Sequence, residues 1–256
     1  MVPRIYVAKG NRKIHPNFGA WSLPAPDTCP MADKCLNYCS RFKVQKGVST
    51  PRAAWGENLF ASRRKDFAKR MIARILEFDL LGVRVHASGD FFSKPYVNAW
   101  ATIADRLDDR IFWAYTKSLH LNLSPLEELS NFALTRSFGG LLDKRILKTK
   151  HNYAVVVDNL SQVKANEFTC PAEMPGVKLS GLIQDTWCGN KCFHCLPPNG
   201  TDGKQIRVAF LKQMAGWNGP TELAARRLAA LRGTRLSPMG SGNQQVVLNA
   251  KGEGCQ

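Results

Sequence analysis

Several features that would place this chain in a familiar class are missing. Its longest apolar runs, such as the one around residues 80–85, are far too short to cross a bilayer, and the N-terminal residues lack the apolar stretch of a signal peptide. These absences predict a cytoplasmic protein without a membrane partner. Since the cytosol keeps thiols reduced, we interpret most of the eight cysteines as metal ligands rather than as four disulfides.

Acidic residues are scarce relative to basic ones. The sequence has 20 Asp and Glu against 36 Lys and Arg, a net charge of +16 that exceeds what solubility requires. Basic stretches lie at residues 63–70, 144–150 and 225–235. They predict contact with nucleic acid, and the simpler alternative is that they are solvated helix faces. Zinc-finger histidine pairs, basic-zipper heptads and RNA-recognition signatures are all absent, so the sequence does not choose between DNA and RNA.

The cysteines form an early group in one short loop and a late group in a Gly- and Pro-rich region, and one further cysteine lies at the C-terminus. They are Cys29, Cys35 and Cys39; Cys170, Cys188, Cys192 and Cys195; and Cys255. Thiols this close in sequence can meet at one point, as a metal ion or an iron–sulfur cluster requires. Cys255 is interpreted as a free thiol near a chain end.

The two groups predict different roles. Four thiolates are a closed ligand set for Zn²⁺ or a [4Fe–4S] cluster, so the late group is expected to staple its segment together. Three thiolates leave one position open, on a cluster iron or on zinc, unless a histidine such as His15 or His86 closes it. A zinc deaminase or hydrolase is disfavoured, since the usual His-x-Glu element is absent.

The hydrophobic pattern alternates between strand-like and helix-like segments. Strands are expected at residues 19–23, 83–88, 110–118, 131–140, 152–159 and 204–212, and helices at 59–78, from 95 onward and at 220–233. This alternation predicts an α/β fold with a parallel sheet and covering helices. We expect one unit at residues 1–165, and a Cys-rich subdomain at 166–256 that holds the late cysteines beyond the sheet.

Polar residues follow several expected strands, at the carboxyl edge where parallel sheets carry their functional groups. These residues are His86, Ser88, Asp90, Tyr115, Lys117, Arg136 and Asp158. The early cysteine loop follows the first expected strand and is placed at the same edge. Lys117, Arg136 and Asp158 are predicted to line a substrate mouth there as catalytic residues.

A three-cysteine loop after the first strand, followed by a helix and a strand ending in Ser-Gly-Asp, resembles the layout of radical S-adenosylmethionine (SAM) enzymes over residues 19–160. The resemblance implies a partial (β/α) barrel, a [4Fe–4S] cluster on the early cysteines and SAM bound to it. It implies that Ser88, Gly89 and Asp90, with His86 beside them, hold the cofactor. The family's usual cysteine spacing occurs instead at Cys188–Cys195, so which group binds SAM stays open.

A second resemblance covers roughly residues 14–212. Ser-Leu-Pro at 22–24, Thr-Cys-Pro at 28–30, Ser-Gly-Asp-Phe at 88–91 and the late cysteine segment are similar to the uncharacterised bacteriophage gene product 88 family. This likeness implies a phage or mobile-element origin, hence the host cytoplasm. We therefore expect an iron–sulfur, radical-SAM-like enzyme that acts on nucleic acid or nucleotides. The alternative is a non-enzymatic nucleic-acid-binding protein stapled by Fe–S or zinc.

Overall fold

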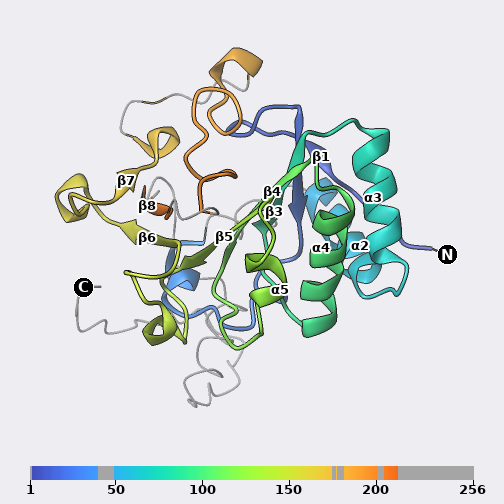
Figure 1. Ribbon diagram of the computed structural model, residues 1–256, viewed down its shortest axis with the longest axis horizontal. Coiled ribbons are helices and arrows are strands. Elements are labelled where there is room, and N and C mark those ends of the chain that lie inside the picture. Colours follow the sequence, from blue (N-terminus) through green and yellow to red (C-terminus); the bar gives the residue numbers. More distant parts are fainter. Residues whose placement is uncertain (1, 40–48, 175–176, 178–181, 201–204, 213–256) are drawn as a thin grey trace, which may run out of the picture.

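A mostly parallel eight-stranded sheet organises the chain, which confirms the expected α/β class (Figure 1). The computed structural model describes residues 2–39, 49–174, 177, 182–200 and 205–212. The strands are β1 (Ala8–Lys9), β2 (Phe18–Ser22), β3 (Gly82–Ser88), β4 (Ile111–Thr116), β5 (Phe132–Ser137), β6 (Tyr153–Val157), β7 (Phe168–Thr169) and β8 (Arg207–Leu211). Their order is β1-β2-β3-β4-β5-β6-β8-β7, and β1 pairs antiparallel to β2 while the other pairings are parallel.

The helices are α2 (Ser49–Ser62), α3 (Phe67–Glu77), α4 (Lys94–Arg106) and α5 (Ser124–Glu127). The short 3-10 turns are η1 (Lys34–Tyr38), η2 (Asp143–Arg145), η3 (Leu160–Gln162), η4 (Pro171–Glu173) and η5 (Ile183–Asp185). The single helix expected over residues 59–78 is wrong, because a turn separates α2 from α3. Arg64 and Asp66 form an ion pair at 2.8 Å in that turn, and the new direction of α3 brings Phe67 against the buried ring of Trp21.

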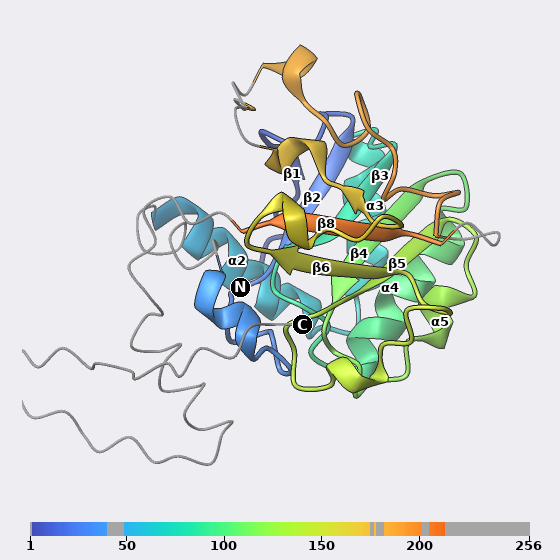
Figure 2. The same cartoon turned by 90° about the vertical axis from the view of Figure 1, so that its left-hand side faces the viewer.

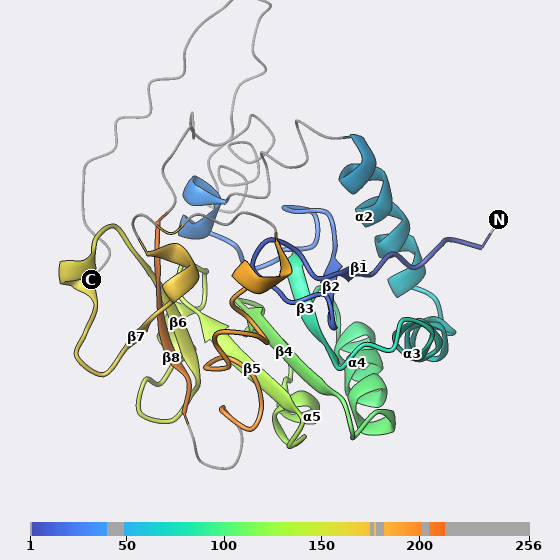
Figure 3. The same cartoon turned by 90° about the horizontal axis from the view of Figure 1, so that it is seen from above.

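Each face of the sheet has its own apolar core. On one face, strand residues such as Val83 and Phe112 pack with Phe67, Trp100 and Ile103 from the helices. Figure 3 shows α4 beside β3 on this face, with α3 next to α4. The opposite face packs against the late segment, which Figure 2 shows on the other side of the sheet from α4 and α5.

The second face is concave. Tyr115 on β4 and Phe210 on β8 contact each other with ring centroids 5.4 Å apart, although β5 and β6 lie between their strands. Three strand spacings in a flat sheet would separate them by about 14 Å. Cys170, Cys188 and Cys195 pack against this curved face. The expectation that the late cysteines lie beyond the sheet is therefore wrong, and residues 168–169 and 207–211 are themselves strands of it.

Strand β3 contains an irregularity that matters for its carboxyl end. Ala20 pairs with Arg84 and Ser22 pairs with Ser88. Between these two pairs the chain moves by four residues along β3 but by only two along β2, so β3 bulges. His86 lies inside this bulge with a φ of 64°, a left-handed conformation that is uncommon for a residue other than glycine. Bulges of this kind redirect side chains and are frequent near functional sites.

Some expectations fall outside the described part of the chain. The helix at 220–233, the basic stretch at 225–235 and Cys255 all lie there. Within the described residues, every helix is too short or too polar to cross a membrane.

Candidate functional site

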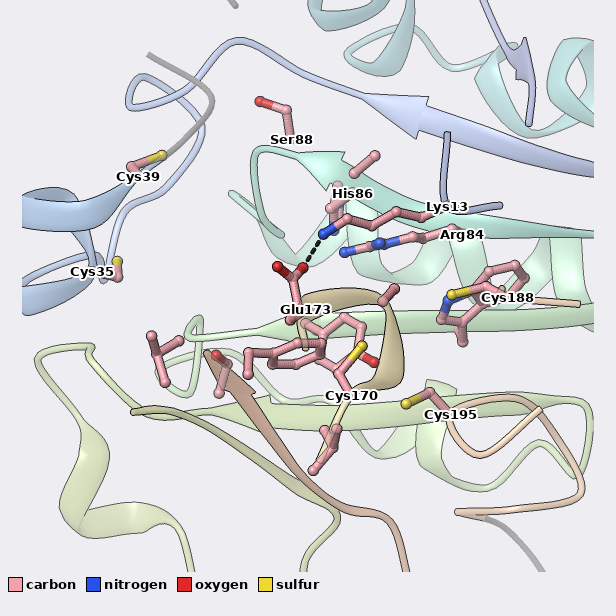
Figure 4. A pocket seen from close by; sticks show the side chains of 18 of the residues that line it. Lys13, Cys35, Cys39, Arg84, His86, Ser88, Cys170, Glu173, Cys188 and Cys195 are labelled. Carbon is pink, nitrogen blue, oxygen red and sulfur yellow. Dashed lines mark hydrogen bonds and ion pairs between the residues drawn. The ribbon is translucent and has the colours of Figure 1, made fainter. Parts of the chain in front are cut away.

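Both cysteine groups line one cavity of about 320 Å³ on the concave face, where it reaches the carboxyl ends of β3 and β4 (Figure 4). The cysteines concerned are Cys29, Cys35, Cys39, Cys170, Cys188, Cys192 and Cys195. None of the cysteines in the described part of the chain forms a disulfide. The sequence suggested two separate sites, whereas the fold brings the two groups to opposite walls of a single space.

The loop after β5 holds the early cysteines in place. The backbone N–H groups of Asp33 and Cys35 donate to the carbonyl oxygen of Gly139, at 3.3 and 3.0 Å. Asp143 accepts hydrogen bonds from the N–H groups of Gly139 and Gly140, both at 2.9 Å. Gly139 has a φ of 97°, and a Cβ there would lie 2.6 Å from the Tyr38 hydroxyl. The turn can therefore approach the cysteine loop only because it lacks a side chain.

Burial favours the protonated form of two early thiols, Cys29 and Cys35. It raises the pKa of Cys29 well above its ordinary value, with further increases from Asp90, Cys35 and Cys39. Burial also raises the pKa of Cys35, while the nearby Lys117 ammonium lowers it. As thiolates, the three sulfur donors would repel one another, and Lys117 offsets only part of that charge. A bound metal cation would stabilise all three thiolates. The early trio therefore fits a thiolate-bound metal or cluster.

The late cysteines are anchored by several parts of the chain. Cys188 N–H donates to Lys13 O at 2.7 Å, and His15 N–H donates to Cys188 O at 3.0 Å. Cys170 N–H donates to Ala209 O on β8 at 2.9 Å. Burial raises the pKa of both Cys170 and Cys188, and Arg84 lowers both. Burial raises the pKa of Cys195 to about 12, against the effect of Tyr115 beside it.

The late group thus offers four soft donors with cations nearby, which also fits thiolate ligation of a metal. In the described residues, no three Cys, His, Asp or Glu side chains are already gathered as metal ligands. Ligation by either group would require the thiols to move closer together, as in sites that are completed by the metal itself.

Asp90 braces the carboxyl ends of two strands. Its Oδ1 accepts from Phe91 N–H at 2.7 Å and from the Thr116 hydroxyl at 2.6 Å, and its Oδ2 accepts from Lys117 N–H at 2.8 Å. Its own N–H donates to Thr28 O in the early cysteine loop at 3.0 Å. Gly89, with a φ of 86°, makes the sharp turn before it. The sequence interpretation missed this bracing role. Most of the hydrogen-bonding capacity of the Asp90 carboxylate is used within the protein.

His86 and Ser88 also line the cavity and carry buried polar atoms without partners in the described structure. His86 Nε2 lies 3.0 Å from the Tyr96 hydroxyl, which accepts from Trp21 Nε1–H at 2.7 Å. Burial lowers the pKa of His86 to about 3, so the ring is neutral. His86 Nδ1 and Ser88 Oγ are the unpartnered atoms.

The three residues predicted as catalytic are not brought together. Lys117 lines the cavity and its Nζ donates to Ser137 Oγ at 2.8 Å. Arg136 pairs instead with Glu127 of α5 at 2.7 Å, and Asp158 pairs with Lys212 at 3.1 Å. Arg136 and Asp158 lie outside the cavity lining, since one turns to the helical face and the other is largely exposed. His15, the other candidate for closing a metal site, also lies outside the lining.

Residues that the sequence interpretation passed over complete the walls. Arg84, Trp113 and Trp187 line the cavity together with Lys13 and Glu173, which form an ion pair. For Arg84 a signal was present, because a charged residue alternates with Val83 and Val85 in a strand that is otherwise buried. For the others, only the curvature of the sheet makes them neighbours.

The fold and site together define an α/β protein with a thiol-lined cavity on a curved parallel sheet. The chain belongs to the gene product 88 family, whose family-level pattern matches residues 6–219. It is 43% identical over 51 residues to the Gene 88 protein of Mycobacterium phage D29, a match that covers 18% of this chain and 21% of that protein. The matched part is thus about a fifth of that relative's length. No solved structure matches the chain.

Proposed function

We propose that this chain is an iron–sulfur enzyme of the radical-SAM type, of phage or mobile-element origin, that acts on nucleic acid or nucleotides. The observation that carries the proposal is the position of the early cysteine loop. It follows β2, the first parallel strand, and its Thr28 carbonyl is bonded to the Ser-Gly-Asp turn after β3 at the carboxyl edge of the sheet. The sequential order from β2 to β6 and the curvature of the sheet support a partial (β/α) barrel.

Cys29, Cys35 and Cys39 would hold the cluster. When bound, a three-cysteine [4Fe–4S] cluster supplies low-potential electrons and one open iron position for SAM. The chain's own groups support that role: Lys117 offsets negative charge at the trio, and Asp90 fixes the adjoining turn.

The late quartet would hold a second group, either a [4Fe–4S] cluster or Zn²⁺. Its position against the concave face supports a role in shaping the cavity wall as well as in stapling the segment between η4 and β8.

The charge of the chain supports a polyanionic substrate. Two of the three basic stretches lie in the described structure, and both place cations at the surface. The exposed cations are Arg63, Arg64, Lys65, Lys69, Lys144, Arg145 and Lys150. The gene product 88 designation and the mycobacteriophage relative support the phage origin.

The test is preparation of the full chain without oxygen, followed by iron and sulfide analysis and measurement of SAM cleavage on reduction. The proposal expects a brown protein with absorbance near about 400 nm and reductive SAM cleavage. Cys35→Ala should lose SAM cleavage, and Cys192→Ala should lose the late metal and destabilise the fold. A colourless protein that contains only zinc would refute the proposal.

A second function is favoured by the late quartet. Its four thiols lie among loops and short turns that join the N-terminal segment to β8, which is how a purely structural metal would be used. The chain would then be a metal-stapled nucleic-acid-binding protein without catalysis. Salt-dependent binding of DNA or RNA by a protein with bound metal, but without SAM cleavage, would select this alternative.

A further inference from the structure

We infer that the cavity binds a single nucleotide, and that Arg84 holds its phosphate. This inference rests on the proposed function in one respect, since it specifies the substrate class of the same site. It needs neither iron nor SAM for its test, because it concerns a binding site formed by the chain's own side chains.

Arg84 is a cation that has no counterion among the residues that the structure describes. It lies on the concave side of β3 with its guanidinium 5.3 Å from the ring centroid of Tyr115, and its Nε is buried without a hydrogen-bond partner. In the described residues it forms no ion pair. Figure 4 shows its side chain extending from the strand into the space between the two cysteine groups. Arg84 is half-buried, and its guanidinium would gain charged hydrogen bonds from an anion in the cavity.

The carboxylates that line the cavity are already engaged. They are Glu173, which forms an ion pair with Lys13, and Asp90, which accepts three hydrogen bonds. Neither is paired with Arg84, so the positive charge that Arg84 brings to the cavity remains for an incoming group.

Two further positions on the same strand carry unsatisfied polar atoms. The Tyr96 hydroxyl accepts from Trp21 and lies 3.0 Å from Nε2 of the neutral His86 ring. Among the described residues, His86 Nδ1, Ser88 Oγ and Arg84 Nε are buried and have no hydrogen-bond partner. Buried polar atoms are normally satisfied, so three on one cavity-lining strand indicate a ligand rich in polar oxygens. A phosphate group has that character and is suited to an arginine.

The size and walls of the cavity favour a nucleotide over inorganic phosphate. Its volume of about 320 Å³ lies within the range of small-molecule sites. Its aromatic lining consists of Tyr38, Trp113, Tyr115, Phe168, Trp187 and Phe210. Such side chains stack on nucleobases regardless of sequence. The nucleotide could be free or the end of a strand, and the experiment separates these sources.

The experiment is calorimetric titration of the full-length chain with nucleoside 5′-monophosphates, the matching nucleosides and short single-stranded oligonucleotides. The variants are Arg84→Gln and Arg84→Lys. Arg12→Gln is the control, because Arg12 is exposed and its loss changes the net charge equally. We expect Arg84→Gln to weaken monophosphate binding by about 10- to 100-fold, as for loss of a charged hydrogen bond. Arg84→Lys should retain part of the affinity, and Arg12→Gln should match the wild type.

The decisive comparison removes the phosphate from the ligand. Nucleosides should bind wild type and Arg84→Gln equally, which assigns the lost affinity to the Arg84–phosphate pair. Preference for monophosphates identifies a free nucleotide, and tighter oligonucleotide binding that still depends on Arg84 identifies a strand end.

Equal monophosphate affinity for wild type and Arg84→Gln would overturn the inference. Loss of the late metal from Arg84→Gln would also overturn it, since the role of Arg84 would then be to offset the charge of the late cysteine thiolates. Failure of SAM cleavage alongside Arg84-dependent nucleotide binding would overturn the enzyme proposal alone.

Discussion

Replacing Gly89 with alanine should strongly destabilise the fold. Gly89 has a φ of 86°, which costs an alanine about 1–2 kcal/mol. A Cβ there would lie 2.6 Å from Thr28 Oγ1 and 2.7 Å from Leu23 Cβ. Neither neighbour is the end of a long flexible chain, so overpacking adds about 1–3 kcal/mol. The free energy of unfolding should fall by about 2–5 kcal/mol in total.

Urea denaturation followed by tryptophan fluorescence measures this loss, with the m-value unchanged. The matched control is Gly56→Ala in α2, where an added Cβ meets nothing within 4 Å. That change should stabilise the protein by about 0.5–1 kcal/mol through helix propensity. If Gly89→Ala lost less than about 1 kcal/mol, the turn beside the early cysteines would not have the described geometry.

Three further predictions concern His86, Asn58 and Asp143. The pKa of His86 in the folded protein, about 3, lies below its ordinary value of 6.5. The unfolded chain therefore binds more protons between pH 6.5 and pH 3, and the free energy of unfolding falls as the pH falls through that range. The pH dependence of unfolding in that range should therefore be shallower in His86→Gln by up to about 1.4 kcal/mol per pH unit, and an identical slope would contradict the burial of His86. Buried Asn58 bonds to both backbone groups of Tyr6 and to Ser22 O, so Asn58→Ala should cost about 2–4 kcal/mol in thermal or urea unfolding, and a neutral result would remove its bridging role. Asp143→Ala frees the Gly139–Gly140 turn, so the reconstituted protein should lose iron at the early site while keeping the late metal; full iron content would show that the turn does not hold the early loop.

The periodicity of the sequence was sufficient to predict the main strands and the parallel arrangement. The alternation of Val83 and Val85 with Arg84 identified β3, and Pro95 marked the start of α4. Local pattern could not find β7, because two residues make too short a run to show a period. It could not find the break between α2 and α3 either, because the charged residues 63–66 suit a helix surface as well as a turn.

The candidate site was predicted in composition but not in geometry. Both cysteine groups were identified, yet their convergence depends on the curvature recorded by the Tyr115–Phe210 contact, a long-range property with no local signature. Arg136 was placed at the mouth because it follows a strand. It lies on the other face because side chains alternate along β5, and Ser137 takes the cavity side. Asp90 was interpreted as a cofactor-binding residue because it follows a strand and matches the turn of the radical-SAM layout, whereas here Thr116 and Lys117 donate to its oxygens.

The pairing of β7 with β8 has a consequence for how this protein could diversify. Phe168 pairs with Val208, so the chain leaves the sheet and re-enters it at adjacent strands. Everything between those strands is an excursion whose ends are fixed at one place, and changing its length alters the closure entropy only slowly. The excursion can therefore change in length at a small cost in closure entropy. One wall of the cavity could be exchanged for another of different length or chemistry, while the strands that carry Arg84, Asp90 and Lys117 stay as they are.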